Sequence, residues 1–190
     1  ALASLFHDIG KECIPLEILD KPGPLTDEER AVINRHPEFG YDMLKNRSEF
    51  SSTVRVSILQ HHENDDGSGY PAGLSHENIY LYARIIHVAD VFDAMLAKRA
   101  YKERYSALET IEYLMANCGH LFNYEVVATF VNFITVYPVG VTVTLSTGEK
   151  AHVIKNRSRY PLRPVVMTED GRTLDLAFDH NYLNITILGV

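Results

Sequence analysis

Two adjacent histidines and three acidic residues stand together in the stretch HHENDDGSGYP, residues 61–71. Imidazole nitrogen and carboxylate oxygen are common protein ligands for iron, manganese and zinc. The same stretch runs into glycines and ends in Tyr-Pro, and glycine lets a backbone turn sharply and approach a ligand closely. The stretch therefore predicts metal-coordinating chemistry beside a flexible turn.

Further imidazoles and carboxylates stand where other predicted helices end. His7 and Asp8 follow one apolar helix, His36 ends a second, and His61 and His62 end a third. A single histidine on an apolar face is more often a hydrogen-bonded core residue than a ligand. Several at helix ends can converge when the apolar faces pack, which is how helical bundles build metal sites. We therefore expect these side chains to meet around metal.

Asp90 lies on a predicted helix whose other positions are mostly apolar. A buried carboxylate without a partner is costly, so a cation should face it. Taken alone, Asp90 is more typical of a salt bridge to arginine or lysine. Beside the histidines described above, it becomes a candidate metal ligand.

The candidate ligands include no thiolate. Cys13 and Cys118 form neither a disulfide framework nor a CxxC metal knuckle. Nitrogen and carboxylate ligands point to iron, manganese or zinc rather than to a structural zinc knuckle. The cysteine content also agrees with a reducing cytoplasm.

The elements that must position these residues are mainly helical. Thr26, with Glu29 three residues on, predicts a helix start, and that helix should run to about His36. Hydrophobic periodicity predicts further helices over 37–47, 52–63, 80–98, 106–117 and 124–137. The helix over 80–98 is apolar on nearly every side, so we expect it to be central.

The hydrophobic pattern changes from helical to alternating after Pro138. Val139, Val141, Val143 and Leu145 share one face of a predicted strand, and STGE turns the chain back into a hairpin. A second hairpin is expected at the Asp-Gly of TEDGRTLDL, and a last strand at LNITIL. These signals predict about five short strands.

Length and composition agree with a globular protein in two parts. The chain has 190 residues, of which 46% are hydrophobic and 23% charged. We predict a mainly α fold, with a helical bundle over residues 1–137 and a small β-rich, barrel-like appendage over 138–190. No run approaches the roughly 18 apolar residues of a membrane span. We therefore expect a soluble, cytoplasmic protein.

The net charge of −7 would repel a polyanion, so no nucleic acid polymer is expected as a partner. A phosphate-bearing ligand would have to be held locally, by metals or by a few placed cations.

Five stretches in order, HDIGK, KPGPLTDEE, HPEFG, HHENDDGSGYP and VADVFDAM, resemble the HD-GYP domain, a branch of the HD superfamily of metal-dependent phosphohydrolases. The resemblance covers residues 1 to about 137. The region that begins YPVGVTVTLSTGE resembles a β extension that accompanies some members of the family.

The resemblance implies metal ligands that are all imidazoles or carboxylates: His7, Asp8, His36, His61, His62 and Asp90. Asp8 would bridge two divalent metals, with His7 and Asp90 on one and the remaining histidines on the other. Iron or manganese is favoured. Family members carry further ligands on a helix upstream of HDIGK that this sequence does not include, so a third metal stays open.

The resemblance also implies residues that touch substrate. Lys11 would contact a phosphate oxygen or protonate the leaving oxygen, and Arg99 and Lys102 would contact phosphate or guanine. Gly69 and Tyr70, of the GYP signature, would lie beside the nucleotide. The alternative for Arg99 and Lys102 is a pair of solvated surface charges, and the alternative for Tyr70 is a structural turn.

Other polar residues of the sequence receive lesser roles. His87 stands where the family usually has a small apolar residue, so we expect it to pack behind the ligands. Asp93 is expected to orient a ligand or cap local polar groups. The remaining histidines are expected to be ordinary surface residues: His76, His120, His152 and His180.

The function implied by the resemblance is hydrolysis of cyclic di-GMP to pGpG by a metal-activated hydroxide, and further hydrolysis to GMP stays open. Two alternatives stay open: a cyclic-dinucleotide sensor or protein-interaction module without turnover, and a phosphohydrolase for another nucleotide. The sequence opens in mid-pattern, with Leu2, Leu5 and Phe6 as the last turns of an apolar helix. We therefore expect a longer protein with an upstream sensory or regulatory domain. A homodimer stays open, and the β extension is expected to serve docking or to stabilise a dimer.

Overall fold

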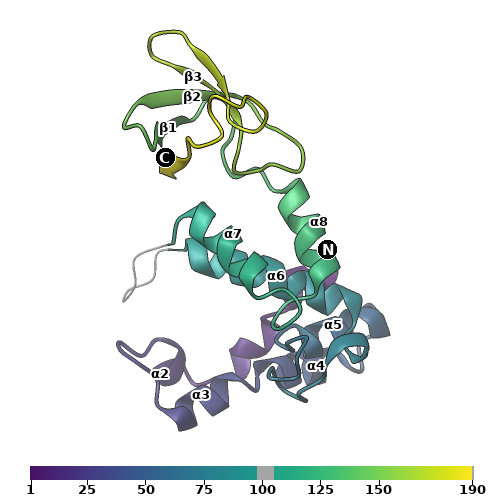
Figure 1. The fold of residues 1–190 in the computed structure, drawn as a ribbon. Helices are drawn as coiled ribbons and strands as arrows, with labels where there is room; N and C mark the ends of the chain where they lie inside the picture. The colour runs from purple at the N-terminus through teal and green to yellow at the C-terminus, as the bar shows by residue number, and fades with distance from the viewer. Residues whose placement is uncertain (98–104, 190) are drawn as a thin grey trace. The chain divides into compact units, whose positions relative to one another are not determined.

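The computed structural model describes residues 1–97 and 105–189 (Figure 1). The chain folds as two compact units, each of two segments: Ala1–Arg104 with Tyr113–Val127, and Tyr105–Glu112 with Ala128–Val190. The predicted division into residues 1–137 and 138–190 stays a prediction, because compactness does not show that either part folds alone. A mainly helical protein with a small β part is confirmed.

The helices that the structure describes before residue 98 belong to the first unit: α1 Leu2–Phe6, η1 Ile9–Cys13, α2 Leu16–Leu19, α3 Asp27–Ile33, α4 His36–Leu44, α5 Ser52–Gln60, η2 His76–Asn78 and α6 Leu81–Leu96. Two more, α7 Ala107–Ala116 and α8 Tyr124–Phe133, follow. Each helix predicted from the sequence is present and is shorter than its hydrophobic pattern, because that pattern continues into the turn residues after the helix.

Side-chain caps fix the starts of two helices near the site. The Thr26 hydroxyl accepts a hydrogen bond from Glu29 N at 3.3 Å, and the Glu29 carboxylate accepts one from Thr26 N at 2.7 Å. This capping box satisfies two otherwise unpaired backbone donors of α3, as the sequence predicted. At α5, the Ser51 hydroxyl accepts from Val54 N.

Two glycines allow the segment after α1 to lie directly on α4. A Cβ placed on Gly10 would lie 2.0 Å from the carbonyl oxygen of His36 and 2.5 Å from the nitrogen of Gly40. A Cβ on Gly40 would lie 3.0 Å from the Ile58 side chain. The absence of side chains here lets the backbones of η1 and α4 touch and lets the Ile58 side chain of α5 pack against Gly40, which brings together the residues at the ends of these elements.

The helix α6 is less central than the sequence suggested. It buries Ala83, Ile86 and Val88, but Tyr82 and Ile85 on another side are 52% and 43% exposed. The apolar pattern over 80–98 therefore reflects one buried face together with apolar residues that remain at the surface.

The strands form one antiparallel sheet in the order β4-β3-β2-β1-β5. Their bounds are β1 Thr142–Leu145, β2 Lys150–Lys155, β3 Val165–Thr168, β4 Thr173–Asp175 and β5 Ile187–Gly189. Both predicted hairpins are present, with Gly148 and Gly171 at positive φ in their turns. Among the described strands β4 and β5 are edges, so the sheet is open where a barrel-like form was expected.

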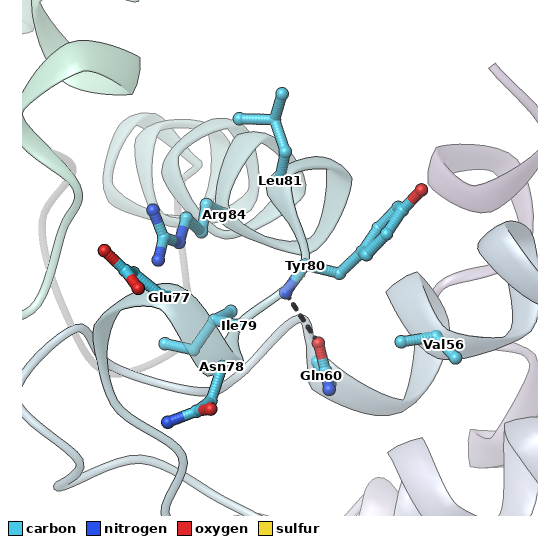
Figure 2. A pocket seen from close by; sticks show the side chains of 8 residues that line it. All are labelled: Val56, Gln60, Glu77, Asn78, Ile79, Tyr80, Leu81 and Arg84. Atoms are coloured by element: carbon cyan, nitrogen blue, oxygen red, sulfur yellow. Dashed lines mark hydrogen bonds between the residues drawn. The ribbon is translucent and has the colours of Figure 1, made fainter.

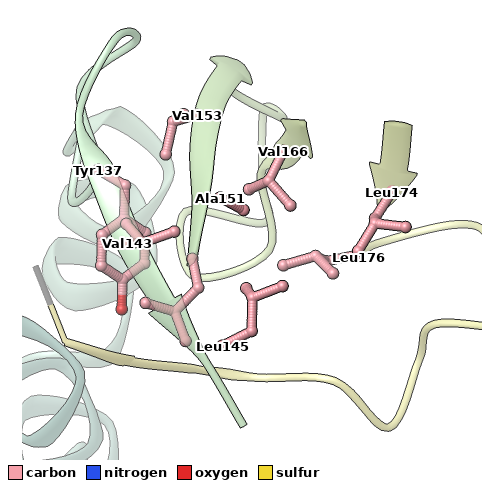
Figure 3. Close-up of a cluster of buried hydrophobic side chains, with 9 residues drawn as sticks. Tyr137, Val143, Leu145, Ala151, Val153, Val166, Leu174 and Leu176 are labelled. Carbon is pink, nitrogen blue, oxygen red and sulfur yellow. The ribbon is translucent and has the colours of Figure 1, made fainter. Parts of the chain in front are cut away.

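The sheet buries an apolar cluster on one face (Figure 3). Val143 and Leu145 alternate inward from β1, as predicted, while Val139 precedes the strand and is 62% exposed. Ala151 and Val153 do the same from β2. Burial of such side chains is the main source of stability for so small a sheet.

Across the described parts of the chain, before and after the 98–104 segment, no helix combines the length and apolarity that crossing a membrane requires.

Candidate metal centre

Four side chains predicted as ligands meet in the first unit. One ligand atom from each of Asp8, His36, His61 and His62 lies within 4.8 Å of every other. They come from the turn after α1, the first residue of α4, and the two residues after α5. Residues up to 54 positions apart in the sequence thus converge, as the pattern of histidines at helix ends predicted.

The backbone fixes the orientation of three of the histidines in the same way. The Nδ1 atoms of His7, His36 and His61 lie 2.8, 2.8 and 2.6 Å from the carbonyl oxygens of the residues three positions earlier. A carbonyl oxygen only accepts, so Nδ1 carries the proton and donates it. In the neutral ring, Nε2 then has a free lone pair that points away from the helix end, which is the form that binds metal.

The Asp8 carboxylate lies between two groups of these nitrogens. Its Oδ1 lies 3.2 Å from His36 Nε2 and 3.9 Å from His61 Nε2. Its Oδ2 lies 3.4 Å from His7 Nε2 and 2.6 Å from Lys11 Nζ. One oxygen therefore faces each group, which is the arrangement that a bridging carboxylate needs.

The arrangement of acceptors calls for a cation. His36 Nε2 and His61 Nε2 are 3.2 Å apart, and both face Asp8 Oδ1. Because the Nδ1 protons are donated to carbonyls, both of these nitrogens and the Asp8 oxygen can only accept hydrogen bonds. In addition, His7 Nε2 and Asp8 Oδ1 are buried without a hydrogen-bond partner. A divalent metal with nitrogen and oxygen preference satisfies all of them, so the residues fit the group.

Burial keeps two of the imidazoles neutral. It lowers the pKa of His61 to about 3 and that of His62 to about 2. Both are therefore unprotonated at neutral pH and available as ligands. Electrostatic repulsion from neighbouring imidazoles acts in the same direction.

His7 and Asp90 form the second half of the site. His7 Nε2 lies 3.6 Å from Asp90 Oδ1, and the Asp90 side chain is 31% exposed. The neighbouring Asp8 and Asp90 carboxylates raise the pKa of His7 to about 10, and the nearby His7 imidazole lowers the pKa of Asp90. A cation is thus favoured between these two carboxylates, either a proton on His7 or a metal.

Tyr70 lies against the ligand histidines. Its ring stacks on that of His62, with centroids 4.8 Å apart and an interplanar angle of 28°, and is 6.4 Å from the ring of His36. Burial raises the pKa of Tyr70, and the negative charges of Asp8 and Asp90 raise it further, so the phenol stays protonated. The structure thus brings Tyr70 to the cluster, and its contact with substrate stays a prediction.

The loop that carries Tyr70 is held more firmly than the glycines suggested. Tyr70 N donates to His62 O at 3.1 Å. A Cβ on Gly69 would lie 2.3 Å from Asn64 N and 2.5 Å from His62 O, so only glycine fits there. The flexible turn expected over DDGSGYP is a loop folded back on the backbone of the ligand histidines.

Sequence reasoning missed two acidic residues of this stretch. Glu63 and Asp65 are buried, with 2% and 5% exposure, and neither belongs to the cluster of ligand atoms around Asp8. Asp65 lies 3.5 Å from Arg84 Nε and 3.8 Å from His76 Nδ1. Their position directly after the histidines was the only signal in the sequence, and it suggested that they bind metal. In the structure, Glu63 instead accepts hydrogen bonds from backbone nitrogens, and Asp65 lies beside basic side chains.

The other predicted residues are placed as follows. Lys11 lies at the rim of the cluster through its contact with Asp8. His87 is buried, with its ring centroid 5.0 Å from that of Phe122 and 6.5 Å from that of His62. Asp93 is exposed on α6. Arg99 and Lys102 lie outside the described residues.

A pocket of ≈ 480 Å³ lies beside the start of α6 and includes none of the predicted ligands (Figure 2). In it, the Gln60 side-chain oxygen accepts a hydrogen bond from Tyr80 N at 2.7 Å. This bond joins the end of α5 to the start of α6. It therefore fixes the spacing between the histidines that follow Gln60 and the helix that carries Asp90.

The family model described as HD domain matches residues 1–126. The chain belongs to the HD domain family. This HD domain is 43% identical over 165 residues to a cyclic di-GMP phosphodiesterase of Pseudomonas aeruginosa, covering 87% of the chain and 40% of that protein. It is 40% identical over 126 residues to a 3'3'-cGAMP-specific phosphodiesterase of Vibrio cholerae, covering 66% of the chain and 24% of that protein.

A solved HDG"Y"P protein from Bdellovibrio bacteriovorus has the same fold, with a TM-score of 0.52 and 24% identity over 66% of this chain and 39% of that one. The resemblance of this HD domain to HD-GYP domains is confirmed. The chain spans less than half the length of each of these proteins. Membership of the family implies dependence on divalent metal, in agreement with the donor set described above.

Proposed function

We propose that this HD domain is the catalytic part of a metal-dependent phosphodiesterase that hydrolyses cyclic di-GMP to pGpG and onward to GMP. The observation that carries the proposal is the Asp8 carboxylate, which turns one oxygen to His36 and His61 and the other to His7. The similarity to a cyclic di-GMP phosphodiesterase over 87% of the chain supports the substrate.

We propose two divalent metals, held on either side of Asp8. His36, His61 and His62 would hold one, and His7 and Asp90 the other. Iron or manganese suits this set of imidazoles and carboxylates without thiolate, and a third metal stays open. When bound, such a pair supplies Lewis acidity toward a phosphoryl oxygen and lowers the pKa of water to about 7.

The chain's own residues would bind and orient the phosphodiester. The Lys11 ammonium, at the rim beside Asp8, can approach a phosphate oxygen or supply a proton to the leaving oxygen. Because the protein carries a net charge of −7, a dianionic substrate needs such a local cation. Tyr70 and the Gly69 backbone offer a surface beside the ligand histidines, and contacts from Arg99 and Lys102 stay a prediction.

A second cyclic dinucleotide is the main alternative substrate. The specific observation in its favour is the 40% identity to a 3'3'-cGAMP-specific phosphodiesterase over 126 residues. The metal centre acts on phosphodiester bonds that both dinucleotides share, so base contacts would decide between them. A sensor without turnover is the third possibility. An upstream regulatory domain, a homodimer and a docking role of the sheet stay predictions.

The test is hydrolysis by the full-length protein, purified without oxygen and loaded in turn with iron, manganese and zinc. Cyclic di-GMP and 3'3'-cGAMP would be supplied separately and in competition, and products resolved by chromatography. We expect metal-dependent formation of pGpG and a higher kcat/KM for cyclic di-GMP. A higher kcat/KM for 3'3'-cGAMP would establish the alternative substrate. Tight binding of a cyclic dinucleotide without product, whichever metal is loaded, would show that the domain is a sensor.

A further inference from the structure

Glu63 is a buried carboxylate beside the metal centre that the chemistry described above does not use. It is 2% exposed and follows the ligand pair His61 and His62 directly. An ionised carboxylate in such a place must be compensated by hydrogen bonds or a cation. Its partners are the backbone nitrogens of Ala72 and Leu74, which donate to Oε1 at 2.7 Å and to Oε2 at 2.8 Å.

These two bonds hold the far side of the loop that begins at Gly67. On the near side, Tyr70 N donates to His62 O, and Gly69 packs on the backbone of residues 62–64. The loop is therefore held at two points. Tyr70 N is bound to the backbone of His62, and Ala72 N and Leu74 N are bound to the side chain of Glu63.

The fastening determines where the Tyr70 ring lies. Its near-parallel stacking on His62, at 4.8 Å, depends on a loop that returns over the histidine pair. A stacked ring restricts rotation of the His62 side chain and covers one side of it. Burial of Tyr70 and the rise in its pKa from Asp8 and Asp90 place the phenol within the electrostatic field of the centre.

We propose that Glu63 is a positioning residue, whose carboxylate clamps the loop through Ala72 N and Leu74 N and thereby seats the Tyr70 ring on His62. The expected effect of Glu63 on turnover rests on the proposed phosphodiesterase function. Glu63 itself touches neither metal nor substrate. Three consecutive residues thus have different roles. The imidazoles of His61 and His62 supply ligand atoms to the cluster, and the carboxylate of Glu63 holds the loop.

The structural part of the proposal is tested by hydrogen exchange on the full-length protein, which needs no activity. Glu63→Gln keeps the size of the side chain, but its amide group faces a backbone N–H and can accept only one of the two bonds. We expect at least about tenfold faster exchange in peptides covering residues 70–75, with α5 and α6 unchanged. Glu77→Gln, with the same charge change at an exposed position two residues after that segment, is the matched control and should exchange like the wild type.

Two results would overturn the clamp. Unchanged exchange over residues 70–75 in Glu63→Gln would show that the carboxylate does not hold the loop. Faster exchange spread through α5 and α6 would make Glu63 a general folding residue. If Glu63→Gln does not fold, Glu63→Asp, which keeps the charge and shortens the reach, is measured in its place with the same two criteria.

The functional part is tested by a double-mutant cycle between Glu63→Gln and Tyr70→Ala. We expect each single variant to lower kcat/KM for cyclic di-GMP by about 10- to 100-fold with bound metal unchanged, as for other residues that orient a ligand. The double variant should lie within about twofold of Tyr70→Ala, because Glu63 acts through Tyr70. Multiplied losses would contradict this route. If the wild type hydrolyses no cyclic dinucleotide, the proposed function fails while the exchange result still decides on the clamp.

Discussion

The interior of the helical unit and the interior of the sheet are built from different residues. Around the metal centre, the helical unit buries imidazoles and carboxylates, among them His36, His61 and Glu63 at 0–2% exposure. The sheet buries aliphatic side chains such as Leu145 and Leu174 at 0%. Buried polar groups cost free energy unless they are paired, whereas buried aliphatic groups supply it. From this difference we propose that the helical unit carries the chemistry, while the docking role of the sheet stays a prediction.

The largest effect is expected where a ligand is removed from the polar interior. His61→Ala removes one of the four donors of the cluster and leaves Asp8, His36 and His62. It should lower metal affinity at least about 100-fold, since even a residue that only orients a ligand contributes about 10–100-fold. Hydrolysis of cyclic di-GMP should fall by a similar factor. Metal analysis and steady-state kinetics on the same preparation measure both. His152→Ala, in the sheet, is the histidine control and should retain metal and activity.

The converse change removes an apolar group from the sheet. Leu145→Ala should lower the free energy of unfolding by about 2–5 kcal/mol, because it deletes buried methyl groups and leaves a cavity. Metal content per folded molecule should not change. Denaturant unfolding and metal analysis check the two statements, and loss of metal from folded Leu145→Ala would break the proposed separation of roles.

A change at the contact between η1 and α4 should affect both stability and the centre. In Gly10→Ala the added Cβ meets the His36 carbonyl, so the backbone must shift at a cost of about 1–3 kcal/mol. His36 would move with its backbone, and metal affinity should fall. Gly189→Ala, where a Cβ would meet nothing within 4 Å, is the matched control. If Gly10→Ala and Gly189→Ala had the same free energy of unfolding and the same metal affinity, the close contact at Gly10 would not position His36.

The smallest expected effect concerns the Arg157–Asp175 ion pair of the sheet. Burial is the largest single influence and acts to raise the pKa of Asp175. The hydrogen bond and charge of Arg157, together with hydrogen bonds from the backbone of Ala177 and Phe178, outweigh it, so the net pKa is lowered. A carboxyl with a lowered pKa in the folded state contributes stability above its unfolded pKa of 3.8, and that contribution is lost as pH falls through the folded value. We expect about 0.5–1 kcal/mol, absent in Asp175→Asn. Unfolding at pH 7 and pH 3 should show a smaller loss in that variant than in the wild type.

Much of this architecture follows from local sequence signals. The Thr26 capping box and the hairpin turns each depend on residues within a few positions of one another. The ligand residues lie up to 54 positions apart, and their convergence was predicted from their places at the ends of helices whose apolar faces pack. The role of Glu63 could not be predicted, because its partners lie 9 and 11 residues away across a folded loop. The exposed side of α6 and the open edges of the sheet also depend on tertiary packing, which an apolar pattern alone does not specify.

The most direct test of the metal centre is the metal content of the full-length protein, purified without oxygen and compared with Asp8→Ala. Among the carboxylates of residues 1–97 and 105–189, Asp8 is the one with an oxygen toward each group of ligand nitrogens. We predict two divalent ions per chain in the wild type and a loss from both positions in the variant, with loss of cyclic di-GMP hydrolysis. Full metal content and turnover in folded Asp8→Ala would contradict the account.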